Sequence, residues 1–562
     1  MVFRVKHSKL PLLFGVLLLT VLFGFPYLSR DFLGLEHDTL FHLSRIEGLA
    51  ESISRCDFFP ALYPYKNNGF GYASPLFYND LFLIPSALLY LCQVPLSICY
   101  ILQVIVLTFC SAWAMASLCY RITDSMPAAL VSAAAFTFSN YRITDVYVRG
   151  ALGEVTAMLF LILLVEAVYV LFEEQNKNGW FLLWLSISGL LCSHNLTALM
   201  GIIVFLLYWI CLAPRCSRSI HRSCLKALVL SFLSTAWFTI PMLEQLHSQQ
   251  FLLNYYASAS DLADSALSLS RYLANKTVFG YASNQLPEHL QMTLNPGYFL
   301  MLSPLLWFAL PKNSRSSAVL KLTLLVGVVS CLLPSQLLPW DKLQFLRVLQ
   351  FPWRFLNLAI VFLAIPASYA IAKLFSKHNW VMVGLLVILL GEGFWHVLPA
   401  RGRDFGITSS TAYEDLLSGE LIDPYYSASY VRVELAGGEY LPINSPDFRT
   451  YSPSIKDTDG KDLFIPYVKD GLRFDFTVDN VPEGTTVVLP LTWYKGYRAY
   501  DCDGAVAIQA SKESLVEVVC DHTDTYTVVF ETTLLRCICG WISLFALSAV
   551  LFCRHFLHVR EK

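Results

Sequence analysis

Long apolar runs recur along almost the whole of this chain of 562 residues. A helix needs about 20 mostly apolar residues to cross the hydrocarbon core of a bilayer, with about 17 as the lower limit. Charged residues make up only 15% of the chain, against about 25% in soluble domains, so these runs are too many to be soluble cores. The sequence predicts a polytopic α-helical membrane protein. Candidate runs start near Pro11, Leu76, Ile98, Met126, Val155, Trp180, Leu196, Leu225, Tyr298, Val319, Phe355, Trp380 and Leu534.

The net charge of −2 and the absence of a basic block exclude a nucleic-acid-binding tail, so no nucleic acid is expected as a partner. Basic loops instead set the orientation, because cytoplasmic loops are enriched in Lys and Arg. They all fall on one side if the run from Leu76 to Cys92, which contains Asp80 and Pro85, does not cross. This predicts about 12 transmembrane helices with both termini cytoplasmic. The basic segments are Arg4–Lys9, Arg215–Lys226, Lys312–Arg315, Lys373–Lys377 and Arg554–Lys562.

In this topology, four polar clusters lie together on the outer face: residues 31–75, 141–154, 193–195 and 340–354. Scattered polar residues in a membrane protein have no reason to segregate in this way. We therefore expect a functional pocket at the outer level of the membrane.

The first cluster carries Asp38, His42 and Arg45 at positions i, i+4 and i+7, which share one face of a helix. Glu36 and His37 directly precede them. A divalent metal is possible here, with Asp38 and His42 as ligands. The alternative is an interfacial helix with a solvated charged face.

The second cluster ends with Arg149 and Glu154, where Glu154 opens an apolar run. Acids at membrane depth are costly and are usually paired or functional, so a purely structural Arg–Glu pair is the alternative. The third cluster places His194 in a short turn between two runs, where capping or packing is an equally good explanation.

The fourth cluster puts Arg354 at the start of an apolar helix, where the positive end of the helix dipole disfavours a cation unless an anion also binds. Arginine is suited to gripping a phosphate with two parallel hydrogen bonds. Snorkelling to lipid head groups is the alternative. Acids that deprotonate a hydroxyl or bind a cation, beside arginines at the lipid boundary, suggest a lipid phosphate as substrate.

These residues resemble the GT-C superfamily of membrane glycosyltransferases and, more narrowly, the bacterial membrane family labelled "6-pyruvoyl-tetrahydropterin synthase-related". The label does not describe an activity here, since the chain has nothing like the three-histidine zinc site of a soluble pterin synthase. The resemblance covers about residues 10–400. The matching motifs are His37–His42, Gly69–Tyr72, Arg149–Ala151 with Glu154, Ser193–Asn195 and Pro352–Phe355.

The GT-C resemblance implies a polyprenyl-phosphate-linked sugar donor and an essential acid in the first outer loop. That acid maps to Asp38, with Glu36 as the alternative. In some relatives the acid is a general base, and in others it helps to hold a divalent metal.

The chain loses its long apolar runs between residues 401 and 533, where period-2 alternation such as Leu472–Val478 and Tyr526–Phe530 marks half-buried strands. We expect three parts: a transmembrane module over residues 1–400 with outer loops 29–97 and 244–297, an extracytoplasmic β-rich, sandwich-like domain over 401–533, and a final helix with a basic tail over 534–562. Cys502 and Cys520 are placed to pair if their side of the membrane is oxidising.

Together these features predict a bacterial plasma-membrane glycosyltransferase that moves a sugar from a polyprenyl-phosphate donor to an extracytoplasmic glycolipid or wall polymer. Asp38, His37 and Glu154 would be catalytic. A lipid-linked saccharide or polymer transporter is one rival, but it would bury its charges near the midplane and often shows internal repeats. A non-catalytic scaffold would leave the polar clusters unexplained. The expected substrate-binding residues are His42, Arg45, Arg149, His194 and Arg354.

Overall fold

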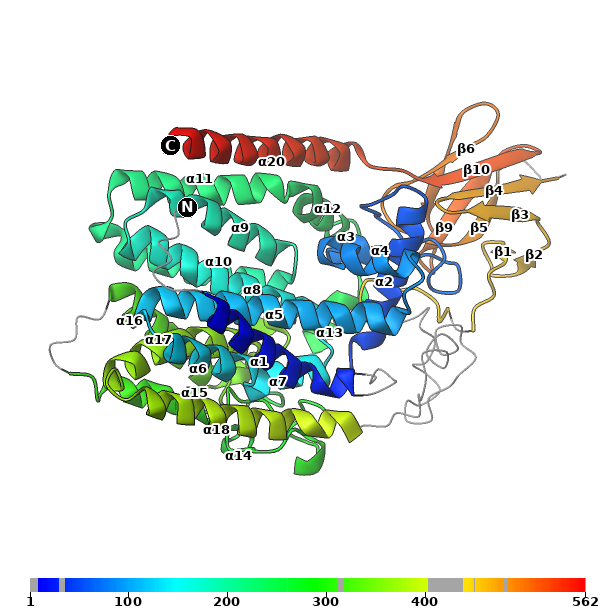
Figure 1. Cartoon of the computed structure of the whole chain (residues 1–562). Helices are drawn as coiled ribbons and strands as arrows, with labels where there is room; N and C mark the ends of the chain where they lie inside the picture. The colour runs from blue at the N-terminus through cyan, green and yellow to red at the C-terminus, as the bar shows by residue number, and fades with distance from the viewer. Residues whose placement is uncertain are drawn as a thin grey trace. The chain divides into compact units, whose positions relative to one another are not determined.

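The computed structural model describes residues 9–29, 36–259, 261–311, 317–402, 438–448, 450–479 and 484–560. The chain forms two compact units that alternate along the sequence (Figure 1). The first comprises residues 1–39, 97–232 and 260–410, and the second 40–96, 233–259 and 411–562. The division of the chain into three consecutive parts, with boundaries at residues 400 and 533, stays a prediction. Two of the basic segments used for the topology, at Arg4 and at Lys312–Arg315, fall wholly or mostly outside the described residues.

The first unit is helical throughout its described regular structure. Its helices are α1 (Leu10–Leu28), α5 (Leu96–Thr123), α6 (Met126–Thr137), α7 (Asn140–Tyr147), α8 (Leu152–Val168), α9 (Trp180–Leu191), α10 (Asn195–Leu212), α11 (Arg218–Ser234), α14 (Leu269–Tyr272), α15 (Tyr298–Leu302), α16 (Ala318–Leu332), α17 (Leu356–Leu374) and α18 (Asn379–Val397). Short 3-10 or π turns lie at Tyr169–Glu173, Lys177–Gly179, Ala213–Arg215, Glu288–Leu290, Ser303–Trp307, Trp340–Lys342, Gln344–Leu349, Pro352–Phe355 (η9) and Leu398–Gly402.

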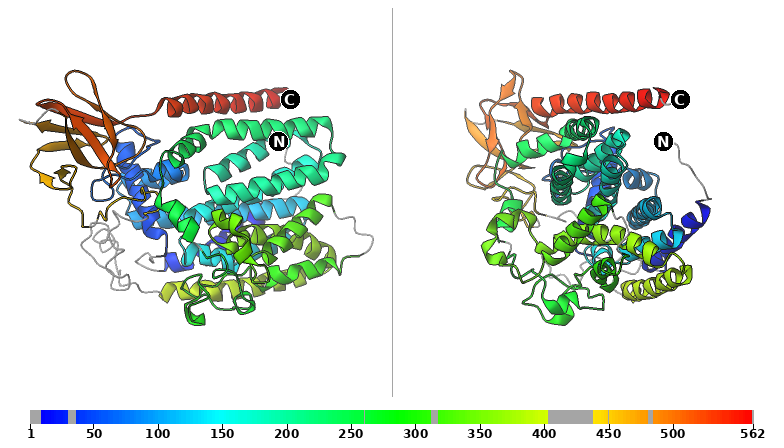
Figure 2. Two further views of the ribbon diagram at one scale, coloured as in Figure 1. Left: turned by 180° about the vertical axis from the view of Figure 1, so that it is seen from behind. Right: turned by 90° about the vertical axis from the view of Figure 1, so that its left-hand side faces the viewer.

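Helix α17 forms the core of this unit, with α6, α8 and α16 packed against it (Figure 2). It is apolar on all sides and almost wholly buried, as expected for a helix without a solvent face. Gly327 lets α16 approach closely, because a Cβ there would lie 2.9 Å from the backbone carbon of Phe362. This packing holds the N-terminus of α17 beside the other polar segments of the unit.

Among the described residues, seven helices are long and apolar enough to cross a membrane, and the bent pair α11 and α12 (Ala236–Leu246), which meet at 62°, would make an eighth. Shorter apolar helices occupy Met126–Thr137, Tyr298–Trp307 and Ala318–Leu332. The run from Leu76 to Cys92 contains the end of α3 and a short apolar helix over Leu81–Leu91, neither of which is long enough to span. The protein is an integral membrane protein of many helices, and the count of twelve crossings stays a prediction.

In its described residues, the second unit combines short helices, one long helix and ten strands. The helices are α2 (Thr39–Ser54), α3 (Ser74–Phe77), η1 (Leu81–Leu83), α4 (Ile84–Leu91), α12 (Ala236–Leu246), α13 (Leu252–Ala259) and α20 (Leu534–Arg560). Helices α12 and α20 lie side by side, and the Ser543 hydroxyl links them by accepting from Trp237 N at 2.9 Å and donating to Leu233 O at 2.9 Å.

The strands form two five-stranded sheets, in the orders β2-β1-β5-β9-β8 and β3-β4-β10-β6-β7. Phe474 and Phe476 of β4 and Val528 of β10 alternate with polar residues and point into the shared core, with Val528 opposite Phe474. This confirms the predicted β-rich domain before the last helix. The strands are β1 (Ile455–Lys456), β2 (Asp462–Leu463), β3 (Tyr467–Asp470), β4 (Arg473–Val478), β5 (Thr485–Thr492), β6 (Tyr497–Tyr500), β7 (Ala505–Val506), β8 (Ile508–Ala510), β9 (Leu515–Cys520) and β10 (Asp524–Phe530).

Candidate functional site

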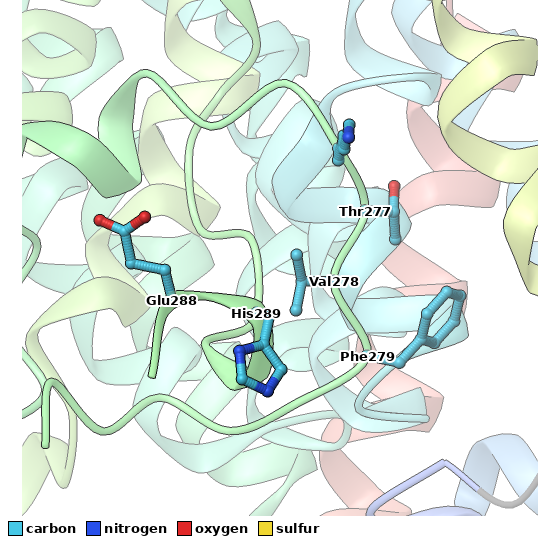
Figure 3. Close-up of a pocket in the computed structure, with 6 residues that line it drawn as sticks. Thr277, Val278, Phe279, Glu288 and His289 are labelled. Carbon is cyan, nitrogen blue, oxygen red and sulfur yellow. The ribbon is translucent and has the colours of Figure 1, made fainter. Parts of the chain in front are cut away.

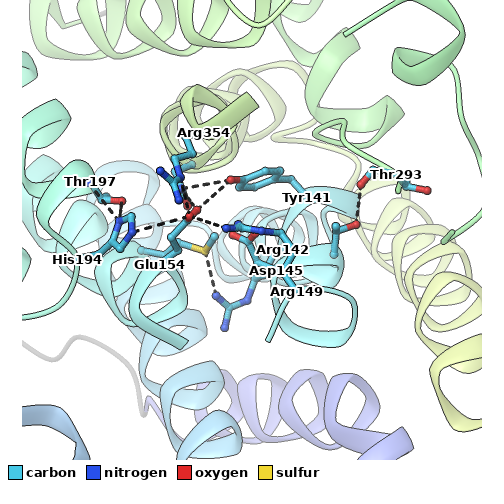
Figure 4. A network of polar contacts seen from close by, with 12 residues as sticks. Tyr141, Arg142, Asp145, Arg149, Glu154, His194, Thr197, Thr293 and Arg354 are labelled. Atoms are coloured by element: carbon cyan, nitrogen blue, oxygen red, sulfur yellow. Dashed lines mark hydrogen bonds and ion pairs between the residues drawn. The ribbon is translucent and has the colours of Figure 1, made fainter. Parts of the chain in front are cut away.

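Glu154 lies in the first turn of α8, and its side chain is buried at the centre of a polar network within the first unit (Figure 4). One carboxylate oxygen, Oε1, accepts from Arg149 Nη2 at 2.9 Å and from Arg354 Nε at 3.1 Å. The other, Oε2, accepts from Asn357 Nδ2 at 2.6 Å and from Tyr141 OH at 3.1 Å. Four donors therefore hold this carboxylate in its charged form.

Arg149 joins Glu154 to a second buried acid. Its Nη1 donates to Oδ1 of Asp145 at 2.5 Å, one helical turn earlier in the chain, and its guanidinium carbon lies 4.4 Å from the centre of the Trp353 indole. The other oxygen of Asp145, Oδ2, is buried and has no hydrogen-bond partner among the described residues. Burial raises the pKa of Asp145, and the adjacent Arg149 opposes that rise.

Arg354 lies in η9 at the start of α17, as the sequence predicts, and its guanidinium is nearly fully buried. The helix dipole predicts an anion beside Arg354. In the structure Glu154 supplies an anion there, and a phosphate bound to Arg354 stays a prediction. The remaining hydrogen bonds of Arg354 run from Nη1 to Leu349 O at 2.9 Å and to Gln350 Oε1 at 2.7 Å.

His194 caps the N-terminus of α10, which is the role given above as the equal alternative to a pocket role. Its Nδ1 accepts from Thr197 N at 3.3 Å and lies 2.8 Å from Thr197 Oγ1, while Nε2 points toward Glu154 Oε1 at 4.0 Å. Burial lowers the pKa of His194 to about 4, so the ring is neutral at pH 7.

Backbone hydrogen bonds hold Asp38 beside this network. Its N–H donates to Arg149 O at 2.7 Å, and His37 N donates to Val148 O at 3.2 Å. Gly150 permits this close approach, since its φ is +62° and a Cβ there would lie 2.5 Å from Thr39 Oγ1.

The Asp38 carboxylate is half-buried and, within the described part of the chain, accepts no side-chain hydrogen bond. Burial raises its pKa, Arg149 and Arg354 lower it, and Glu154 raises it further. A desolvated acid without a bound donor is available to take a proton or to bind a cation. Glu36, the alternative acid, instead accepts from the Thr39 hydroxyl.

The other predicted residues have different surroundings. The His37 ring stacks on Tyr281 with ring centres 4.7 Å apart. His42 and Arg45 belong to the second unit, where Arg45 Nη1 lies 3.2 Å from His42 Nδ1. The Arg45 guanidinium is occupied by Asp80 Oδ1 at 2.8 Å and by two backbone carbonyls, so in this structure it serves an internal ion pair.

Asp38 and His42 are not part of any group of three or more potential metal-binding side chains among the described residues.

Three residues of the network were not singled out from the sequence: Tyr141, Asp145 and Asn357. Asp145 carried a usable signal, since it precedes Arg149 by only four positions and can reach it across the end of α7. Asn357 follows Arg354 by three positions, which places it on the same helical face. Tyr141 offered no signal, because its phenol reaches Glu154 only through the tertiary fold.

A separate cavity of about 710 Å³ lies at the segment between α14 and α15 (Figure 3). None of the residues that line this cavity belongs to the Glu154 network, so the cavity is not part of that site. The lining residues are Lys276, Thr277, Val278, Phe279, Glu288 and His289.

No family model matches the chain, so the narrower family resemblance stays an expectation. An uncharacterised protein of Lactococcus lactis subsp. cremoris (strain MG1363) is 26% identical over 255 residues, which cover 42% of this chain and 39% of that protein. Among solved structures, the mycobacterial arabinofuranosyltransferase AftD aligns with a TM-score of 0.43 at 14% identity, covering 70% of this chain and 27% of AftD. A substituted AftD aligns with a TM-score of 0.44 at 14% identity, covering 70% of this chain and 28% of that one. The alignments thus span well under half the length of each of these proteins.

Proposed function

We propose that this protein is a membrane glycosyltransferase of the GT-C type, which transfers a sugar from a polyprenyl-phosphate donor to an extracytoplasmic glycolipid or polymer. One observation carries the proposal: the half-buried Asp38 carboxylate, which accepts no side-chain hydrogen bond from the described residues, lies against the backbone of Arg149 at the edge of a network that fixes two arginines. The motif resemblance to GT-C enzymes supports the same assignment.

In this proposal Asp38 acts as the general base. Its carboxylate takes the proton of an acceptor hydroxyl, whose oxygen then forms a bond to the anomeric carbon of the donor sugar. The bond from that carbon to the phosphate oxygen breaks, and the electron pair leaves with the lipid phosphate. The raised pKa of Asp38 suits a base, because a more basic carboxylate accepts the proton more readily.

The two arginines supply the positive charge that the leaving phosphate needs. The hydrogen bonds of Arg149 use its two terminal nitrogens, and those of Arg354 use Nε and Nη1. Among the described residues, Arg354 Nη2 and Arg149 Nε donate no hydrogen bond, so these two nitrogens are available to a phosphate. Glu154 is then a positioning residue that fixes both guanidiniums, since its own carboxylate is saturated by four donors.

The test is sugar transfer by the purified protein in lipid nanodiscs, with synthetic polyprenyl-phosphate sugars as donors and extracted surface glycolipids as acceptors. Mass spectrometry of surface polymers and lipids from cells with and without the protein identifies the natural product. Arg354→Lys should weaken use of the donor while the apparent affinity for the acceptor changes little, because lysine keeps the charge but loses the planar fork. An unchanged glycan and lipid profile, together with no transfer from any donor, would contradict the proposal.

A further inference from the structure

The β-rich domain brings a cysteine, a histidine and several carboxylates together at two turns of its strands. Cys502 and Asp503 lie in the turn between β6 and β7, and His522 lies in the connection from β9 to β10. Ligand atoms of Cys502, Asp503 and His522 all lie within 4.8 Å of one another. None of these residues belongs to the Glu154 network.

The individual distances converge on one imidazole nitrogen. His522 Nε2 lies 3.8 Å from Cys502 Sγ, 4.0 Å from Asp503 Oδ2, 3.5 Å from Asp524 Oδ2 and 3.9 Å from Asp501 Oδ2. Two atoms bound to one tetrahedral zinc ion, at about 2.0–2.3 Å from it, are about 3.3–3.8 Å apart. The distances from His522 Nε2 are close to that range, and the remaining separations within the group, all under 4.8 Å, must contract by up to about 1 Å.

The neighbouring contacts hold some of these groups and leave others free to adjust. The Tyr526 hydroxyl is buried, donates to His522 O at 2.8 Å and accepts from His522 N at 3.3 Å, which fixes the backbone of the histidine. Asp524 accepts from Cys502 N at 2.8 Å and so ties the two turns together. The Asp503 side chain is 84% exposed and is free to move onto an ion.

We propose that Cys502, Asp503 and His522 bind a divalent metal ion of the zinc class. A thiolate, an imidazole and a carboxylate are a donor set that zinc accepts, whereas calcium and magnesium take oxygen ligands only. Asp524 and Asp501 contribute negative charge beside the ion. Binding displaces the thiol proton of Cys502 to solvent, so one proton is released and no oxidant is needed.

Such an ion would brace the corner at which the chain passes from one sheet to the other. Cys502 and Asp503 follow β6, and His522 lies where the chain leaves β9 of the other sheet and enters β10, the neighbour of β6. The expected consequence is stabilisation of the β-rich domain by the metal, because an ion that binds only the folded state shifts the unfolding equilibrium.

The test uses the full-length protein in detergent, stripped with a chelator and titrated with Zn²⁺ or Co²⁺. The expected result is one equivalent bound, a thiolate-to-cobalt charge-transfer band in the Co²⁺ spectrum, and a rise in melting temperature with Zn²⁺. Cys502→Ala and His522→Ala should each lower the affinity by at least about 100-fold, beyond the loss typical of an outer-shell residue. Cys56→Ala and His247→Ala remove an exposed thiol and an exposed imidazole elsewhere in the second unit and should leave binding unchanged.

Two results would overturn the proposal. Binding by the wild-type protein without the charge-transfer band would exclude Cys502 as a ligand, even if a variant failed to fold. A disulfide between Cys502 and Cys520, found by alkylation and mass spectrometry of the unreduced protein, would remove the thiolate. Both cysteines are free thiols in the structure.

Discussion

Arg354 donates from Nε to Oε1 of Glu154 at 3.1 Å, although 200 positions separate the two residues in the chain. The bond joins the first turn of α8 to the start of α17. Glu154 thereby becomes the counter-charge for an arginine at a positive helix end, and Arg354 becomes one of four donors to a buried acid. Removing either side chain would leave a buried charge with one fewer counter-charge, which is destabilising.

Replacing Asp38 by asparagine should abolish the proposed base while keeping the shape of the side chain. We expect sugar transfer to fall by at least about 100-fold, the loss typical of a general base, with little change in thermal unfolding. Asp57→Asn, at a half-buried acid of the second unit, is the matched control and should transfer normally. Near-normal transfer by Asp38→Asn would direct attention to Glu36 or Glu154.

Glu154→Gln should destabilise the protein by about 3–5 kcal/mol, because it leaves two buried arginines without their shared anion. Combining it with Arg354→Gln should cost less than the sum of the two single changes, since the pair is then removed together. Glu174→Gln, which breaks a partly exposed pair with Arg121, should cost no more than about 1 kcal/mol. Denaturant unfolding in detergent measures all four variants, and strict additivity would show that the pair is not coupled.

Gly150→Ala should displace the segment that carries Asp38, since the added Cβ would overlap Thr39 Oγ1 and φ is +62°. We expect a loss of both stability and transfer. Gly384→Ala is the control, because a Cβ at this helical position meets nothing within 4 Å, and alanine there should be neutral or slightly stabilising. Equal stability of the two variants would mean that the approach of residues 36–39 to Gly150 is not tight.

His194 should make stability depend on pH. Its folded pKa is about 4 and its unfolded value about 6.5, so between these values the unfolded state binds a proton that the folded state does not. Stability from this residue is complete above about pH 6.5 and falls, by up to about 1.4 kcal/mol per pH unit, as the pH drops toward 4. His194→Asn, which can still cap α10, should unfold with a weaker acid dependence than the wild type. Identical pH profiles for the two proteins would contradict this assignment.

The orientation of the chain can be checked with thiol labels. Native Cys56 and an introduced Ser219→Cys, both at exposed positions, should react from opposite sides of sealed vesicles if the predicted topology holds. An impermeant maleimide with and without detergent distinguishes the sides. Labelling of both from outside would place the Arg215–Lys226 loop on the outer face and require a different number of crossings.

The sequence was sufficient to predict those helices and strands that are marked by a pattern of neighbouring residues. Apolar runs predicted the helices, and period-2 alternation predicted β4 and β10. The charged residues Arg149, Glu154, His194 and Arg354 were also recognisable, because polar groups at the ends of apolar runs are rare.

What each charged group contacts depended on tertiary packing and was not predictable in the same way. The sequence could not show that Glu154 compensates the helix end at Arg354, since the two belong to distant helices. Nor could it show that Arg45 is held by Asp80, or that Tyr141 and Asn357 complete the donors to Glu154.

The short sequence distance between Asp145, Arg149 and Glu154 bears on how the chain enters the membrane. These three residues leave the ribosome together, so the acid at the start of α8 meets a cation before the later helices of the unit are synthesised. Arg354 is synthesised 200 residues later and finds a carboxylate already in place. We therefore expect α17 to be pulled toward α8 while it inserts during translation. A force-sensing arrest peptide placed beyond α17 should register a pull that Glu154→Gln weakens.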